Sequence, residues 1–254
     1  MYEMSNNYIL SLTTIPSKFD NLHLTMDSLV NQTITPTKIV VNIPKVYDFR
    51  MNHSKIPQDK IDAFIEKYSN HNVIINVIDK DFGPGTKLLG LLQSDIVSDM
   101  NTTNTYIILV DDDLIYRPLM IENFNRYIKL HDLDVCSHNV GTFYNIRAGQ
   151  GADGFSMKLN TLDKFLQYFD IIKDQEYLLY HDDFYISYYF YLINKYIHLI
   201  PCPIVCPIFE MHDNSLIDTL SHLQGEHSRE NLNRKSSEVL TELNNTGCFD
   251  VLHQ

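Results

Sequence analysis

The chain has 254 residues, of which 44% are hydrophobic and 20% are charged, and its formal net charge at pH 7 is -12. This length allows a substantial hydrophobic core and lies at the upper end of the usual size of one domain. A surface that binds nucleic acid needs clustered lysine and arginine, so the acidic balance argues against nucleic acid as a partner. The same acidity suits carboxylates around a divalent cation, although most acidic surplus serves only solubility.

The cysteines and the apolar runs bear on the cellular compartment. No CxxC or paired His spacing accompanies the four cysteines, so isolated thiols in a reducing compartment are expected at Cys136, Cys202, Cys206 and Cys248. No apolar run approaches the roughly 20 residues that span a bilayer, and the N-terminus has no signal pattern. We therefore expect a cytoplasmic protein without a transmembrane segment. Abundant Asn, Ile, Lys and Tyr is typical of an AT-rich genome, such as that of a virus.

Short apolar runs alternate with helix-like segments in the first half of the chain. The runs are rich in β-branched residues and predict buried parallel strands at residues 8–12, 38–43, 73–78 and 106–110. Apolar residues at three- and four-residue spacing predict helices at residues 21–30, 59–68 and 86–96. This order predicts an α/β fold with a doubly wound sheet, in which ligands collect at the carboxyl ends of the strands.

The second half begins with mixed signals and ends in a polar segment. A Gly-rich segment at residues 149–155 precedes an apolar strand, and residues 181–187 open an aromatic helix. Helical spacing places five residues on one face of this helix: 185, 188, 189, 192 and 196. We therefore expect most of them to pack in the core and not to form a platform on which a sugar stacks. Beyond about residue 215 the chain predicts a covering helix or a loose tail.

The strongest local feature is an acidic triplet that follows the apolar run at residues 106–110. Asp111, Asp112 and Asp113 repel one another at the mouth of a buried strand unless a cation or a hydrogen-bond network neutralises them. Mg²⁺ or Mn²⁺ does this with one or two carboxylates, and takes its other ligands from water and phosphate oxygens, which favours a diphosphate. The alternative is a set of solvated loop aspartates that cap the next helix near Pro118.

An apolar strand that runs into such a triplet resembles the DxD motif of GT-A class nucleotide-sugar-dependent glycosyltransferases, in particular inverting family 2-like members. The resemblance covers roughly residues 8–212 and rests on the order of three short motifs: LTTIP at residues 12–16, KDFGPGTK at residues 80–87, and the triplet. It implies a Rossmann-like, mostly parallel sheet flanked by helices, with Mn²⁺ or Mg²⁺ bound by Asp111 and Asp113. The donor would be a nucleoside-diphosphate-sugar, most often a UDP-sugar, with Asp111 and Asp112 near it.

The resemblance also implies donor contacts in the first half. In the family, the end of the first strand and the loop after the third hold the base and the ribose. This implicates Thr13, Thr14, Pro16 and Asp81.

The segment from Asp81 to Lys87 carries a signal of its own. Gly83 and Gly85 allow close backbone approach, and the Thr86 hydroxyl can cap a helix whose N-terminal amides attract anions. Lys87 adds a cation that can balance the diphosphate charge on the side opposite the metal. The alternative is an ordinary loop with an N-capped helix and a solvated lysine.

The Gly-rich segment resembles the family loop that faces the donor sugar and the acceptor, which implicates Gly151, Asp153 and Gly154. It is not a nucleotide-binding fingerprint, because the Walker spacing is absent. The alternative is a simple turn before a buried strand.

Asp182 and Asp183 resemble the acidic pair that begins a helix in inverting GT-A enzymes. A sugar hydroxyl is a poor nucleophile, and a carboxylate within hydrogen-bond reach can take its proton. Asp183 is the predicted base, and Asp182 would orient acceptor hydroxyls or substitute for it. The alternative is helix capping. Asp182 stands where the family usually has Glu, so a retaining outcome stays open.

His212 lies where many members of the class place a late histidine that completes metal or diphosphate coordination. Imidazole is acceptable for Mn²⁺ without being its preferred ligand, and the alternative is a solvated or core histidine.

Together these features predict a single domain over residues 1–254. Residues 8–115 would form the nucleotide-sugar-binding half, residues 116–215 the acceptor and catalytic half, and residues 216–254 a polar C-terminal helix or tail. The predicted function is metal-dependent, hexosyltransferase-like transfer of a sugar to a hydroxyl of a glycan acceptor, with inversion. Two alternatives are a nucleotidyltransferase or phosphohydrolase that uses the acidic cluster, and a catalytically silent nucleotide-sugar-binding relative.

Overall fold

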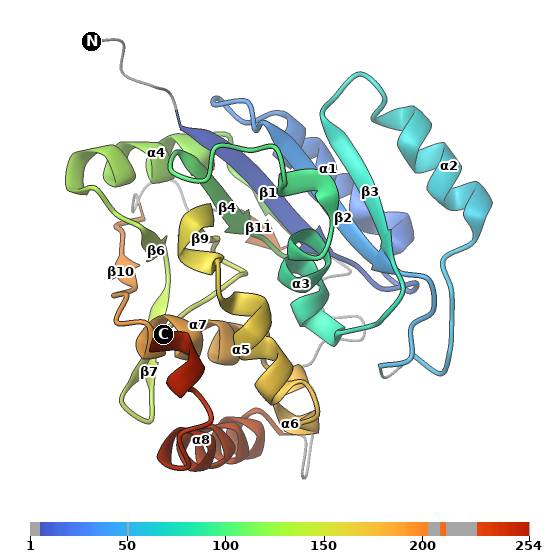
Figure 1. The fold of residues 1–254 in the computed structure, drawn as a ribbon. Coiled ribbons are helices and arrows are strands. Elements are labelled where there is room, and N and C mark those ends of the chain that lie inside the picture. The colour runs from blue at the N-terminus through green and yellow to red at the C-terminus, as the bar shows by residue number, and fades with distance from the viewer. Residues whose placement is uncertain (1–5, 50, 203–208, 212–227, 254) are drawn as a thin grey trace.

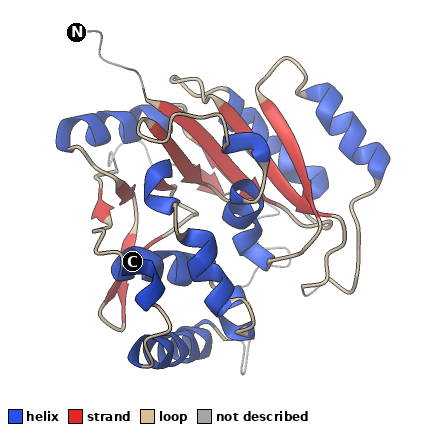
Figure 2. Ribbon diagram, viewed as in Figure 1, coloured by secondary structure: helices blue, strands red, loops and turns tan. Residues whose placement is uncertain are grey.

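The computed structural model describes residues 6–49, 51–202, 209–211 and 228–253. The predicted ligand His212 and the first part of the polar C-terminal segment therefore lie outside the described residues. The described elements form a central sheet between two layers of helices (Figures 1 and 2).

The central sheet of the described chain has seven strands in the order β10-β6-β9-β4-β1-β2-β3. Their bounds are β1 Asn7–Thr13, β2 Lys38–Pro44, β3 Val73–Ile78, β4 Thr105–Leu109, β6 Val135–Ser137, β9 Phe155–Lys158 and β10 His198–Leu199. Strands β1 to β4 are parallel, whereas β9 runs antiparallel to its neighbours β4 and β6. The predicted α/β fold with a mostly parallel sheet is confirmed, and it contains all four strands predicted in the first half.

Helices cover both faces of this sheet. The α-helices are α1 Leu22–Val30, α2 Gln58–Lys67, α3 Thr86–Leu92, α4 Met120–His131, α5 Phe165–Ile172, α6 Glu176–Leu179, α7 Asp182–Leu192 and α8 Arg229–Asn245. Short 3-10 turns lie at Phe19–Asn21, Gly83–Gly85, Asp95–Val97, Leu159–Leu162 and Asp250–His253. One face packs against α1, α2 and α4, and the other against α3, α5 and α7, with α8 beside α6 and α7 (Figure 1).

The strands feed two hydrophobic cores because successive side chains point to opposite faces of a sheet. In β1, Ile9 packs into the core with α3, α5 and α7, whereas Tyr8 and Leu10 pack into the core with α1, α2 and α4. In β4, Ile107 and Ile108 divide in the same way. A strand covered on both sides is mostly apolar, which explains the apolar runs in the sequence, and the polar exceptions Ser11 and Asn42 are buried and hydrogen-bonded.

The order of the strands places a topological switch point at the carboxyl ends of β1 and β4. The chain extends the sheet from β1 through β2 to β3, and α3 then carries it back to β4 on the other side of β1. Open α/β sheets bind ligands where the strand order reverses in this way. β1 ends at Thr13 and β4 ends at Leu109, just before the acidic triplet. The triplet and the segment after β1 therefore meet at this switch point.

Two smaller sheets complete the described fold. β5 (Leu114–Tyr116) pairs with β11 (Phe209–Met211). β7 (Val140–Phe143) and β8 (Ile146–Gly149) form an antiparallel hairpin. β8 leads directly into the Gly-rich segment, which turns into β9.

The helix predicted over residues 86–96 is shorter in the structure. α3 ends at Leu92, and a separate 3-10 turn follows, with the Ser94 hydroxyl accepting from the Ile96 amide. Thr86 does not cap α3, because it is the first residue of the helix and not the residue before it. Its hydroxyl instead accepts from the Phe82 amide over 3.1 Å.

The prediction for the tyrosine-rich run is confirmed except at its end. Tyr185, Tyr188 and Tyr189 are buried in α7, whereas Tyr196 is 57% exposed. Helical spacing no longer applies to Tyr196, because α7 ends at Leu192.

The polar C-terminal segment includes the covering helix α8, whose Leu240 is fully buried. The described cysteines, Cys136, Cys202 and Cys248, are not joined in disulfides. Among the described residues, no helix is both long and apolar enough to cross a membrane.

Candidate functional site

Lys18 holds two carboxylates of the acidic triplet. Its Nζ lies 2.8 Å from Asp113 Oδ2 and 3.7 Å from Asp112 Oδ1. The Lys18 side chain is 10% exposed, and those of Asp112 and Asp113 are 12% and 17% exposed. These carboxylates are therefore not solvated loop aspartates.

Burial and charge shift the pKa values in this group. Burial raises the pKa of Asp112 to about 6, and the Lys18 ammonium opposes that rise. Burial alone would lower the pKa of Lys18, but the carboxylates of Asp112 and Asp113 outweigh it and raise that pKa. Lys18 therefore stays charged and compensates the buried acids. Lys18 was not predicted from the sequence, where its place two residues after Pro16 is its one local signal.

Lys87 connects the triplet to the first turn of α7. Its Nζ lies 2.7 Å from Asp111 Oδ1 and 3.2 Å from Asp182 Oδ2. Its side chain is only 6% exposed, so it is not a solvated lysine. Burial would lower the pKa of Lys87, but Asp111 and Asp182 raise it well above its ordinary value. Ser11 Oγ and Asn42 Nδ2 both donate to the Lys87 carbonyl, which anchors the residue beneath β1 and β2.

Asp183 joins the same group through the Gly-rich segment. The Gly151 amide donates to Asp183 Oδ1 over 2.9 Å. A methyl group on Gly151 would lie 3.0 Å from Lys87 Nζ, 3.3 Å from Asp183 Oδ1 and 3.6 Å from Asp111 Oδ1. We refer to Lys87, Asp111, Asp182 and Asp183 as the acid–lysine cluster. Gly151 lies against this cluster, and only a residue without a side chain leaves these polar atoms uncovered.

The acid–lysine cluster contains three carboxylates and one ammonium. Burial raises the pKa of Asp183 to about 8, Asp182 adds to the rise, and Lys87 opposes it. A carboxyl of raised pKa keeps its proton to a higher pH than an ordinary aspartate and is a stronger base once ionised. Asp183 lies in the first turn of α7, where the helix dipole favours an acid, and its bond to Gly151 leads outside the helix.

Tyr116 ties the triplet to the Gly-rich segment. Its hydroxyl accepts from the Asp111 amide over 2.8 Å and donates to the Ala152 carbonyl over 3.0 Å. Tyr116 was not predicted from the sequence, because a tyrosine in a short apolar strand carries no local signal of such a contact.

The rest of the predicted acceptor loop has structural contacts of its own. The Gly154 amide donates to the Gly151 carbonyl over 2.9 Å, and Gly154 has a φ of +85°. Asp153 accepts from Asn139 Nδ2 over 3.1 Å, and burial raises the pKa of Asp153. The segment is thus a tight turn, as the simpler interpretation predicted, and it also places Gly151 in the site.

The predicted donor residues lie at the same edge of the sheet. Thr13 Oγ1 donates to the Asn42 carbonyl over 2.8 Å, and the buried Thr14 accepts at its carbonyl from Tyr47 Oη over 2.9 Å. Pro16 follows them and is partly buried. These two hydrogen bonds fix Thr13 and Thr14 against β2 and the segment that follows it.

Asp81 organises the loop after β3. Its two carboxylate oxygens accept from the Phe49 and Gly83 amides, each over 2.8 Å, and burial raises its pKa. Gly85 serves packing more than ligand approach, because a methyl group there would lie 1.8 Å from Tyr185 Oη.

The predicted metal site has suitable chemistry but few protein ligands. Among the described residues, no three His, Cys, Asp or Glu side chains converge to hold a metal ion. Mg²⁺ needs only one or two carboxylates when phosphate and water fill the other positions. The Asp111 side chain, at 34% exposure, is the most open of the triplet, and Asp113 provides a second hard oxygen ligand. Both carboxylates are hard oxygen donors of the kind that Mg²⁺ and Mn²⁺ prefer, and each is paired with an ammonium, Asp111 with Lys87 and Asp113 with Lys18.

Comparison with known proteins gives a likeness in fold alone. No family model and no curated protein sequence matches the chain. The structure of S. aureus TarS, a glycosyltransferase, is similar with a TM-score of 0.52 and 15% identity, over 94% of this chain and 43% of TarS. TarS 1–349 gives a TM-score of 0.48 at 17% identity, over 74% of this chain and 56% of that one. TarS 1–349 with UDP-GlcNAc gives 0.47 at 16% identity, over 74% and 54%.

This chain spans about half the length of the TarS chains that it matches, between 43% and 56%. At 15% identity, the match to TarS shows that the two chains share a fold.

Proposed function

We propose that this chain is a glycosyltransferase that transfers a sugar from a nucleoside-diphosphate-sugar to a hydroxyl of a glycan acceptor. The observation that carries the proposal is the convergence of Lys87, Asp111 and Asp183 around Gly151 at the switch point of the sheet. The convergence brings together a cation for phosphate, an oxygen ligand for a metal, and a base of raised pKa.

The donor is proposed to be a UDP-sugar, bound by Thr13, Thr14, Pro16 and Asp81 at the base and ribose. TarS shares the fold, and its solved complexes include UDP and UDP-GlcNAc, which motivates the choice of nucleotide. Asp111 and Asp113 would hold Mn²⁺ or Mg²⁺, with Asp112 beside them. The ion would neutralise charge on the leaving diphosphate.

Asp183 is the proposed base. Its carboxylate would accept the proton of the acceptor hydroxyl as the oxygen attacks the anomeric carbon, and the bond from that carbon to the diphosphate oxygen would break. Displacement from the opposite face inverts the configuration. Asp182 would orient acceptor hydroxyls, and the Lys87 ammonium would stabilise charge on the diphosphate. Gly151, Asp153 and Gly154 would border the donor sugar and the acceptor.

Calorimetric titration of the purified chain tests the donor site. A panel of nucleoside diphosphates is titrated with and without Mn²⁺, on the wild type, on Asp113→Ala and on the exposed control Asp99→Ala. We expect metal-dependent binding of one nucleotide that Asp113→Ala loses and Asp99→Ala keeps. If no nucleotide of the panel binds, with or without Mn²⁺, the proposal is overturned.

The released product separates the proposal from its alternatives. Incubation with the sugar donor that binds should release a nucleoside diphosphate. Release of pyrophosphate or inorganic phosphate would instead identify a nucleotidyltransferase or phosphohydrolase. Tight binding of the donor and of acceptor glycans without any turnover would identify a silent binding relative.

A further inference from the structure

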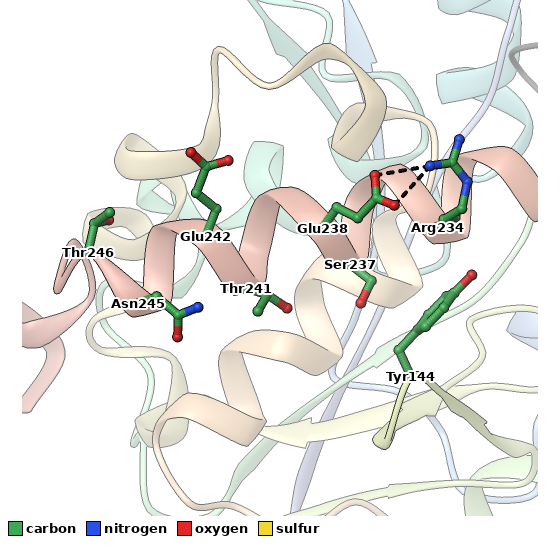
Figure 3. A pocket seen from close by; sticks show the side chains of 8 residues that line it. All are labelled: Tyr144, Arg234, Ser237, Glu238, Thr241, Glu242, Asn245 and Thr246. Carbon is green, nitrogen blue, oxygen red and sulfur yellow. Dashed lines mark hydrogen bonds and ion pairs between the residues drawn. The ribbon is translucent and has the colours of Figure 1, made fainter.

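A pocket lined by none of the acid–lysine cluster lies between the tip of the β7–β8 hairpin and α8 (Figure 3). Its volume is about 440 Å³, within the range of small-molecule sites. Tyr144 borders it from the hairpin, and the rest of its lining comes from α8 and the residue after it.

The hairpin holds Tyr144 in an unusual conformation. Tyr144 and Asn145 have φ values of 48° and 68°, as a two-residue turn with left-handed residues requires. Asn and Gly take this conformation readily, whereas a tyrosine adopts it at a cost. Tyr144 is nevertheless 52% exposed, so burial in the core does not offset the conformational free energy of this backbone geometry. An exposed aromatic ring held over a pocket is a stacking surface for an apolar ring face.

α8 presents neutral polar groups to the same pocket. Ser237, Thr241 and Asn245 are four residues apart, so they lie on one face of the helix, the face turned toward the hairpin in Figure 3. A row of this length extends along about 12 Å of helix. None of the three side chains hydrogen-bonds to another described residue. Hydroxyl and amide groups opposite an aromatic ring match the hydroxyls and the apolar face of a sugar.

The charges around the pocket disfavour an anionic ligand. Arg234 forms an ion pair with Glu238 at 2.8 Å, which neutralises the cation among the lining residues. Glu242 adds a negative charge that none of the lining residues balances. A phosphate-bearing polymer would therefore meet repulsion here, whereas an uncharged glycan would not.

The hairpin connects the pocket to the candidate site. β8 begins two residues after Tyr144 and ends at Gly149, so an extended chain covers about 17 Å from Tyr144 to Gly149, and Gly151 comes two residues later. We propose that the pocket is a distal subsite for the acceptor, and that it binds an uncharged glycan chain of several sugar units. This proposal rests on the proposed glycosyl transfer, because it assumes that the chain extends from the site at Asp183.

The chain contains no tryptophan, so Tyr144→Trp introduces a single fluorescent reporter and keeps an aromatic ring in the pocket. The probes are uncharged maltohexaose, cellohexaose and chitohexaose, with a heparin hexasaccharide as the anionic comparison. The control reporter is Tyr191→Trp, at a residue that is 54% exposed outside the pocket. We expect saturable emission changes at position 144 with at least one uncharged probe, and none at position 191.

A second substitution links the signal to the pocket. Thr241→Arg in the Tyr144→Trp background changes an exposed residue, so it should leave the fold intact and weaken probe binding at least tenfold. The proposal is overturned if no uncharged probe changes the emission at position 144, or if the emission at position 191 changes equally. It is also overturned if the heparin probe binds more tightly than the uncharged probes. These titrations need no donor, so they test glycan binding separately from the proposed transfer. A saturable signal in a protein that binds no nucleotide would support the glycan site and contradict the transfer.

Discussion

The chemistry of Asp183 depends strongly on its surroundings. Burial and the neighbouring Asp182 raise its pKa to about 8, so its ionised fraction increases between neutral and alkaline pH. If Asp183 is the base, kcat/KM should rise with pH up to about 8 and then level off, since only the carboxylate accepts a proton. The pH profile of the wild type is the direct measurement, and a flat profile between pH 6 and 9 would contradict the assignment.

Asp183→Asn should lower kcat by roughly 10² to 10⁴ and remove the rise with pH. Nucleotide binding should persist in calorimetry. The raised pKa also predicts that this carboxyl favours folding below its unfolded pKa, and that the contribution is lost as pH rises through about 8. Denaturation of the variant should therefore depend less on pH than that of the wild type. Asp170→Asn, at a carboxyl that is 70% exposed, is the control and should change neither profile.

Lys87 is expected to affect both stability and donor binding. Lys87→Met leaves Asp111 and Asp182 without their ammonium, and breaking a buried pair in this way costs about 3–5 kcal/mol. The loss should be greater at pH 8 than at pH 6, because the Lys87 ammonium stabilises the ionised form of Asp183 and a larger fraction of Asp183 is ionised at pH 8. Denaturant titration at both pH values measures it, and the donor KM should rise. Lys80→Met, at an exposed lysine of the same loop, should stay within about 0.5 kcal/mol.

At the scale of elements, the turn between β8 and β9 offers a matched pair of glycine substitutions. Gly151→Ala meets no backbone strain but crowds Lys87 Nζ and Asp183 Oδ1, so kcat should fall about tenfold with little loss of stability. Gly154→Ala meets a φ of +85° and a Phe124 ring atom at 2.9 Å, so stability should fall by more than about 1 kcal/mol. Steady-state kinetics and thermal denaturation of both variants measure this division. If each variant lost kcat and stability to the same extent as the other, the two glycines would not have these separate roles.

At the scale of the molecule, the site lies between elements that pack into both cores. β1 and β4 feed the two cores, and α3 and α7 bring Lys87 and Asp183 to the edge of the sheet. A donor that joins these parts should stabilise the whole fold. At a ligand concentration 100 times Kd, UDP with Mn²⁺ should add about 2.7 kcal/mol to the free energy of unfolding. Thermal denaturation checks this, and Asp113→Ala should lose the shift that Asp99→Ala retains.

Local signals were enough to predict much of the fold. The apolar runs identified β1 to β4, the four strands of the first half, because a strand covered on both faces needs mostly apolar residues. The triplet was recognised because three adjacent acids at a strand end need compensation. By contrast, the end of α3 at Leu92 and the exposure of Tyr196 were not predicted, since both depend on where a helix stops.

The sequence by itself determined the α/β fold, the edge of the sheet that carries the site, and the acidic residues that stand there. Only the tertiary structure decided which groups meet: Lys18 with Asp113, Lys87 with Asp111 and Asp182, and Tyr116 with the Gly-rich turn. Strand and turn signals are local, so they can be read along the chain. Ion pairs and pKa values depend on burial and on contacts between distant segments, which arise only when the chain packs.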